Sequence, residues 1–68
     1  MQRVGKITSV NQILGLGEII DGQDQEIFFE LTDTIGKITP EEKVFFEIEL
    51  KREGLRAVRV QTCTPGNG

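Results

Sequence analysis

Histidine is absent from this 68-residue chain, and cysteine occurs only once, as Cys63. A single cysteine cannot form an internal disulfide, which excludes a disulfide scaffold. Without histidine, zinc sites and catalysis by a nucleophile–imidazole pair lose their ordinary ligands and bases. The sequence therefore predicts no metal, no cofactor and no enzymatic activity, and Cys63 is expected to be an incidental thiol.

A surplus of basic residues is also missing. Eight Lys and Arg residues stand against eleven Asp and Glu residues, which gives a net charge of −3. This balance does not attract phosphate, and nucleic-acid-binding domains more often carry a basic surplus. No apolar run approaches the roughly 20 residues that span a membrane. The first five residues begin no apolar secretory stretch, so a cytoplasmic protein with no membrane partner is expected.

The length allows one small domain. A chain of 68 residues is too short for two domains and buries only about 60% of the surface that its unfolded form exposes. Hydrophobic residues make up 37% of the chain, enough for one compact core but not for a deep substrate cavity as well. We expect a monomer with one folded domain over residues 1–62 and a flexible tail over residues 63–68.

Five segments have the composition of β-strands. They are rich in β-branched and aromatic residues, and residues 46–50 alternate apolar with acidic side chains, as in a strand with one wet face. Asp21-Gly22 is a strong turn pair, so residues 17–31 are predicted to form a hairpin with a polar tip at 22–25. Residues 51–54 are a second predicted turn. The predicted strands cover residues 3–10, 17–20, 26–31, 43–50 and 55–60.

The segment at residues 32–42 lacks the pattern of a strand. Residues 39–42 (TPEE) look like a helix start, but strand chemistry resumes at Lys43, so only a single helical turn or a type I β-turn fits. We favour the turn. Five short strands with one longer connection after the third predict an all-β fold, a five-stranded antiparallel barrel, because closure removes exposed strand edges.

Four segments, in order and at matching intervals, resemble the bacterial cold-shock domain family. Residues 5–19 (GKITSVNQILGLGEI) are similar to its opening, and residues 27–32 (IFFELT) are similar to its third strand. Residues 43–47 (KVFFE) and 54–60 (GLRAVRV) are similar to its last two strands. The resemblance covers residues 3–61 and implies a five-stranded OB-fold barrel that binds single-stranded RNA or DNA.

The structural positions of the family are retained. The resemblance implies turns or close backbone approach at Gly5, Asn11, Gly15, Gly17 and Gly54. It also implies a core of seven apolar residues: Ile7, Ile19, Ile27, Val44, Phe46, Ala57 and Val60. The fold is therefore better supported by this resemblance than the binding chemistry is.

The positions that bind bases in the family are mostly replaced. The family stacks bases on exposed aromatic rings of its first three strands and holds the backbone with lysines. Here its Lys-Trp-Phe run is Thr8-Ser9-Val10, a lysine is Leu14, and of the stacking rings only Phe28 is kept. The candidate face comprises six residues: Ser9, Leu16, Glu18, Phe28, Glu30 and Leu31.

These replacements predict weak or altered binding of nucleic acid. Base–aromatic stacking is worth roughly 1–3 kcal/mol per base, so losing four or so contacts removes on the order of 4–12 kcal/mol. Micromolar binding amounts to only about 8 kcal/mol in total. Glu18 and Glu30 are expected to lie near each other on this face, where their carboxylates repel phosphate.

Several of these residues also have a structural interpretation. Phe28 is either a half-buried barrel residue or a stacking platform. The rings of Phe29 and Phe45 alternate with those of Phe28 and Phe46, so one pair is expected to point outward. Glu18 and Glu30 are better interpreted as a solvated pair than as a general acid and base, since no cleft, nucleophile or ligand set accompanies them.

Two functional hypotheses remain open. Basic residues near the last hairpin either balance neighbouring carboxylates or contact phosphate; the candidate phosphate contacts are Lys6, Arg52, Arg56 and Arg59. They favour a module that binds single-stranded nucleic acid. An outward cluster of Leu16, Phe28 and Leu31 would instead form an apolar patch. That patch favours a protein-interaction module that has lost nucleic-acid binding.

Overall fold

The computed structural model describes residues 2–63, so most of the predicted tail lies outside the described residues. The strands are β1 (Arg3–Asn11), β2 (Leu16–Asp21), β3 (Glu26–Glu30), β4 (Thr34–Ile35), β5 (Lys43–Lys51) and β6 (Gly54–Thr62), and a 3-10 helix, η1 (Leu31–Asp33), follows β3. None of the helices within residues 2–63 is long and apolar enough to cross a membrane.

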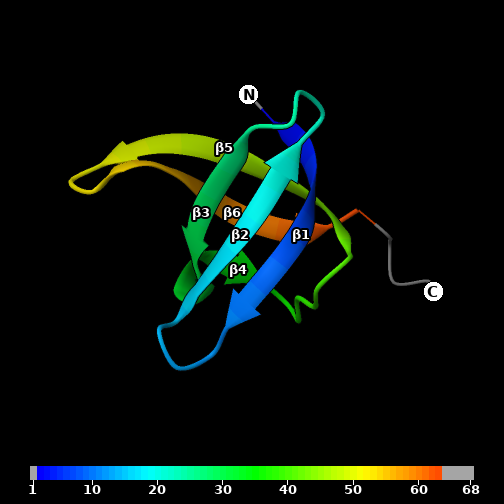
Figure 1. Ribbon diagram of the computed structural model, residues 1–68, viewed down its shortest axis with the longest axis horizontal. Coiled ribbons are helices and arrows are strands. Elements are labelled where there is room, and N and C mark those ends of the chain that lie inside the picture. The colour runs from blue at the N-terminus through cyan, green and yellow to red at the C-terminus, as the bar shows by residue number, and fades with distance from the viewer. Residues whose placement is uncertain (1, 64–68) are drawn as a thin grey trace.

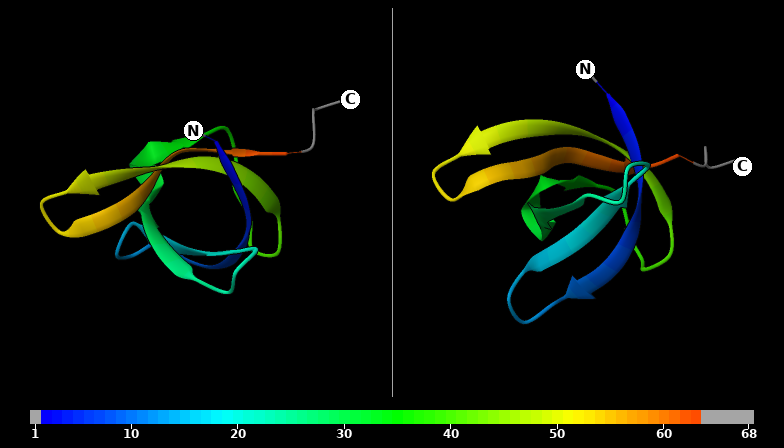
Figure 2. Two further views of the ribbon diagram at one scale, coloured as in Figure 1. Left: turned by 90° about the horizontal axis from the view of Figure 1, so that it is seen from above. Right: turned by 45° about the horizontal axis from the view of Figure 1, so that its top comes forward.

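The strands form one sheet that closes on itself. Their order is β3-β2-β1-β5-β6-β4, and an additional pairing joins β3 to β6. Neighbours in the chain β3-β2-β1-β5-β6 are antiparallel, whereas the closing contact, Phe29 with Ala57, is parallel. Figures 1 and 2 show the closed barrel and the β5–β6 hairpin, which extends beyond its body. The predicted five-stranded barrel is confirmed.

The segment between β3 and β5 differs from its prediction in three ways. It contains η1, where Thr34 Oγ1 donates to the carbonyl of Leu31 at 2.8 Å, and the two-residue strand β4, which pairs in parallel with β6. The β-turn at residues 39–42 is present, since the Glu42 amide donates to the Thr39 carbonyl. However, Glu41 has φ 74°, which fits the third position of a type II turn and not the predicted type I.

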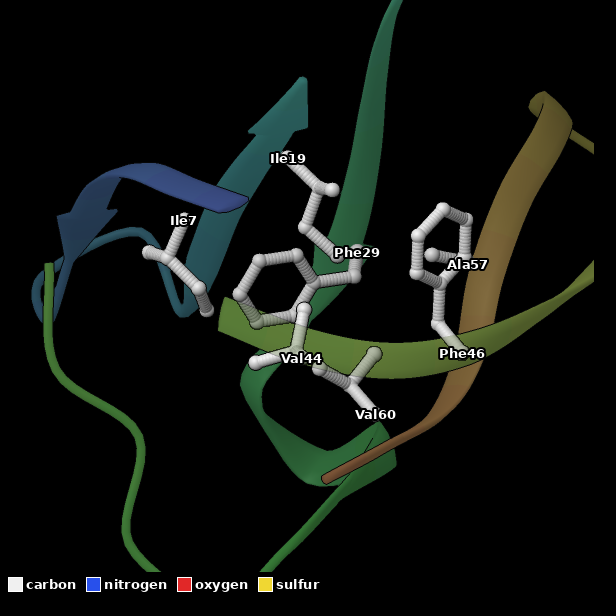
Figure 3. Packing of buried hydrophobic residues seen from close by; sticks show 7 residues of the cluster. All are labelled: Ile7, Ile19, Phe29, Val44, Phe46, Ala57 and Val60. Carbon is white, nitrogen blue, oxygen red and sulfur yellow. The ribbon is translucent and has the colours of Figure 1, made fainter. Parts of the chain in front are cut away.

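The core lies inside the barrel (Figure 3). Its fully buried cluster consists of Ile7, Ile19, Phe29, Val44, Phe46, Ala57 and Val60. Six of the seven predicted core residues are in it; Ile27 is only half-buried, and Phe29 takes the central place instead. The inward rings are therefore Phe29 and Phe46. The expectation that Phe29 and Phe45 point to one side, and Phe28 and Phe46 to the other, is wrong. The reason is register, because β3 brings Phe29 directly opposite Gly17 of β2.

Gly17 gives the Phe29 ring its room. A Cβ at Gly17 would overlap the ring of Phe29, so the two residues form a complementary pair across β2 and β3. At Cys63, the backbone amide donates to the Lys43 carbonyl at 3.0 Å. This bond holds the residue that follows β6 against the start of β5.

The tip of the β2–β3 hairpin is held by a carboxylate. Asp21 Oδ1 accepts hydrogen bonds from the amides of Gln23 (2.8 Å) and Gln25 (3.0 Å). These bonds, the one from Gln25 foremost, hold the pKa of Asp21 below its ordinary value. A depressed pKa means that the ionised carboxylate stabilises the fold, and that this stability is lost as the pH falls through the lowered value.

Asp21→Asn is therefore expected to lower the melting temperature at pH 7, because the amide replaces a charged acceptor with a neutral one. The difference from the parent protein should shrink as the pH falls below the ordinary carboxyl value of about 4, because the parent carboxyl then becomes protonated as well. Circular dichroism melts across this range measure the effect. Asp24→Asn, in the same loop, is the matched control: it removes the same charge but neither of the two amide hydrogen bonds to Asp21, so it should change the melting temperature less at pH 7. A pH-independent effect of Asp21→Asn would contradict the prediction.

Candidate functional site

The first three strands arrange the candidate residues in rows across their outer face. Ser9, Glu18 and Phe28 are register partners on β1, β2 and β3, and Leu16 and Glu30 are partners in the next row. An irregularity at Thr8 shifts the register of β1 between Ile7 and Ser9. Five of the six predicted face residues are therefore neighbours. Glu18 and Glu30 share the face, as expected, on a diagonal between adjacent strands.

Glu18 is held from β1. Ser9 Oγ donates to Glu18 Oε1 at 3.3 Å, and Thr8 Oγ1 donates to the Glu18 carbonyl at 3.3 Å. The second contact uses the irregular residue of β1. The carboxylate thus has a polar partner on one flank and the Phe28 strand on the other.

Leu31 does not join this face. It is half-buried in η1, packs against the core and lines a separate hollow with Val10 and Ile38. The predicted patch of Leu16, Phe28 and Leu31 is therefore not continuous. The cause is strand alternation, because the Leu31 amide still donates to the Gly15 carbonyl in the β2–β3 register and the side chain therefore lies on the side opposite Glu30, toward the core.

Phe28 lies beneath a guanidinium group. Its side chain is 46% exposed, and Arg56 Cζ lies 5.8 Å from the centre of its ring, within the range of a cation–π contact. The contact follows from barrel closure, since the pairing of Phe29 with Ala57 places the preceding residues of β3 and β6 side by side. The predicted stacking ring, Phe28, and one predicted phosphate contact, Arg56, are therefore in direct contact.

Phe28 also separates two shallow hollows. One is lined by Ser9, Asn11, Leu14, Leu16, Gly17 and Glu18 together with Phe28. The other is lined by Arg3, Gln25, Glu26, Ile27, Ile48 and Leu55 together with Phe28. Leu14, Ile48, Leu55 and Arg3 were not predicted as site residues. Leu55 pairs with Leu50 across the β5–β6 hairpin, and both side chains are more than half exposed. Strand alternation in the sequence does not distinguish such exposed apolar residues from an ordinary solvent-facing side of a strand.

Two of the four predicted phosphate contacts are engaged in ion pairs. Lys6 lies 3.4 Å from Glu41, and Arg59 donates from Nε to Glu47 at 3.0 Å and also from Nη2. This hydrogen bond lowers the pKa of Glu47 and raises the pKa of Arg59. Within residues 2–63, no ion pair is found for Arg52 or Arg56. Of the four predicted contacts, those two are therefore the cations best able to meet an anionic ligand.

A third ion pair braces the β5–β6 hairpin. Lys51 Nζ donates to Asp33 Oδ2 at 2.7 Å, and both side chains are about a quarter exposed. The hydrogen bond from Lys51 to Asp33 raises the pKa of the Lys51 ammonium. The contact ties the hairpin to η1 and so helps to position Arg56, which lies on the other strand of the hairpin.

The chemistry available at this face is that of binding. Within the described part of the chain, no group of three or more His, Cys, Asp or Glu side chains is placed to hold a metal ion. The face offers one aromatic ring, apolar side chains beside it, a carboxylate and a guanidinium. Such a set can stack one planar group and hydrogen-bond to its edge.

A closed five-stranded barrel with this strand order has the architecture of an OB fold. Comparison with solved structures agrees: a Drosophila Unr structure, "drosophila Unr CSD456", superposes with a TM-score of 0.80 at 22% sequence identity. The match covers 100% of this chain and 29% of the Unr chain. No family model matches the sequence, and no curated protein matches it. The predicted cold-shock fold is confirmed, and the comparison does not bear on a bacterial origin.

Proposed function

We propose that this domain binds single-stranded nucleic acid weakly, through one stacking position at Phe28 and Arg56. The observation that carries the proposal is the exposed ring with a guanidinium 5.8 Å from its centre, in the same row as Ser9 and Glu18. Cold-shock OB barrels present this face to single strands, and stacking on an aromatic ring is open to every base. The role is one of binding without catalysis.

The expected affinity follows from the number of contacts. One stacked base supplies roughly 1–3 kcal/mol, and Arg52 and Arg56 add only salt-sensitive attraction on a chain with a net charge of −3. A dissociation constant of about 1 mM corresponds to about 4 kcal/mol. We therefore expect binding in the high micromolar to millimolar range at low salt.

The test is an NMR titration of the labelled protein with a short pyrimidine-rich single strand at low salt. Saturable shifts are expected at Ser9, Leu16, Phe28 and Glu30. Phe28→Ala should weaken binding about fivefold or more, because it removes the stacking surface. The matched control is Ile35→Ala, another exposed apolar residue (55% exposed) on β4, which should bind like the parent protein.

Three results would contradict this proposal. One is the absence of shifts at millimolar ligand. Another is a set of shifts confined to Arg52 and Arg56 that vanishes at physiological salt, which would indicate charge contact alone. The third is unchanged affinity in Phe28→Ala.

A protein-interaction module is the second candidate, and a specific observation favours it. Leu14 (69%), Leu55 (60%) and Leu50 (76%) are exposed in addition to Phe28, and large exposed apolar patches mark partner surfaces. Binding of a protein through these side chains would weaken little with salt. A titration with nucleic acid that fails, combined with a salt-insensitive protein complex lost in Leu55→Ser, would support this candidate over the first.

A further inference from the structure

We propose that Glu18 makes the position beside Phe28 selective for guanine, an inference that rests on the proposed function. The hollow on the β2 side of Phe28 is open to solvent and has a volume of about 160 Å³. Phe28, Leu14 and Leu16 supply its apolar lining, and its polar lining comes from Glu18, Ser9 and Asn11. A planar base that stacks on Phe28 there meets these polar groups with its edge.

The hydrogen bonds already present decide what those polar groups can still offer. Ser9 gives its hydroxyl proton to Glu18 Oε1, so its oxygen remains an acceptor. Asn11 Oδ1 accepts from the Leu14 amide at 2.9 Å, so its amide NH₂ remains a donor. Within residues 2–63, no cation pairs with Glu18. The carboxylate therefore keeps most of its acceptor capacity, which is about four lone-pair sites.

This pattern matches the base-pairing edge of guanine. Guanine carries two adjacent donors, N1–H and the 2-amino group, and a carboxylate can accept both at once in a bidentate, charge-assisted pair. Its O6 is an acceptor, which the Asn11 amide can satisfy. Adenine and cytosine present a single amino group to a carboxylate. Thymine and uracil present one N–H between two carbonyl oxygens, which the carboxylate repels.

The experiment compares strands that differ at one base. The labelled protein is titrated at pH 7 and low salt with seven-residue thymidine strands whose central base is thymine, guanine or hypoxanthine. Guanine is expected to bind about fivefold or more tightly than thymine, as for a good bidentate pair in an exposed setting. Hypoxanthine, which lacks only the 2-amino group, should lie between them.

Two variants that each remove one negative charge test whether Glu18 causes the guanine preference. Glu18→Gln removes the carboxylate and should reduce the guanine preference to within about twofold, while raising affinity for all three strands because repulsion of phosphate falls. Glu30→Gln, one row away on the same face, should also raise affinity but keep the preference. The amide spectrum of each variant checks that the barrel is intact, and the hypoxanthine strand tests the parent protein without any mutation.

The possible failures are distinguishable. Equal affinities for thymine and guanine, with shifts still centred on Phe28, would overturn the selectivity and leave the proposed function standing. A guanine preference that survives Glu18→Gln, or hypoxanthine binding equal to guanine, would overturn the role of the carboxylate. Absence of binding to every strand would overturn the proposed function and the selectivity together.

Discussion

Phe29→Ala is expected to remove about a third or more of the free energy of unfolding. Phe29 is fully buried at the centre of the core, and truncating a buried phenylalanine costs about 3–5 kcal/mol. A domain of this size has a free energy of unfolding of only about 3–10 kcal/mol. The ring also fills the space that Gly17 leaves open, and Gly17 has no side chain that could move into the resulting cavity.

The adjacent residue supplies the control. Phe28→Ala changes the same residue type one position earlier, but its ring is 46% exposed, so a loss of about 1 kcal/mol or less is expected. Urea unfolding followed by far-ultraviolet circular dichroism measures both variants. A stable Phe29→Ala, or an equal loss in the two variants, would contradict the assignment of inward and outward rings on β3.

Gly5→Ala is expected to destabilise the protein by about 2 kcal/mol or more, since overpacking a closed core costs about 1–3 kcal/mol. A Cβ at Gly5 would lie 2.6 Å from Ile19 Cγ2 and 2.7 Å from the carbonyl oxygen of Ile20. The second contact is with backbone of the paired strand β2, which cannot move without breaking the β1–β2 ladder. The strain therefore cannot be relieved by rotating a side chain.

Gly22→Ala is the matched control for this substitution. A Cβ at Gly22, in the β2–β3 turn, meets nothing within 4 Å, and the change should stay within about 0.5 kcal/mol of the parent protein. Thermal melts at one pH and one salt concentration compare the two. If Gly5→Ala and Gly22→Ala have the same melting temperature, the close approach of β1 and β2 at Gly5 is not a constraint on the fold.

The five long strands could be predicted because their signals are local. β-branched and aromatic residues, the Asp21-Gly22 pair and the alternation after Phe46 each act within a few residues. The type II turn at residues 39–42 depends on the positive φ of Glu41, which its side chain does not favour. The surrounding pairing, including the hydrogen bond from the Glu41 amide to the Ile7 carbonyl, holds that conformation.

The core prediction failed at a single strand for a related reason. Ile27 and Phe29 lie on the same side of β3, and both are apolar, so composition does not rank them. Phe29 is fully buried because Gly17 is its partner and Ala57 closes the barrel beside it, whereas Ile27 lies nearer the open end and lines a surface hollow. Burial depth along a strand depends on where the other strands pass.

The residues of the candidate face could be predicted, but their contacts with one another could not. The resemblance to the cold-shock family picked out Ser9, Leu16, Glu18 and Phe28, and register brings these together. It did not indicate that Leu31 turns away from them. Nor did it separate Arg59, which is paired with Glu47, from Arg56, which lies over Phe28.

The sequence by itself determined the strands, the barrel class and the small number of binding groups at the site. These are one exposed ring in place of several and carboxylates where the family has aromatic or basic groups, with neither histidine nor a second cysteine in the chain. These properties belong to residue types and short-range pattern. Only the tertiary structure decided which ring is buried, which cations are neutralised, and that Phe28 and Arg56, 28 positions apart in the chain, form one contact. Such pairings arise from barrel closure, which brings β3 and β6 together and is not encoded in the neighbourhood of either residue.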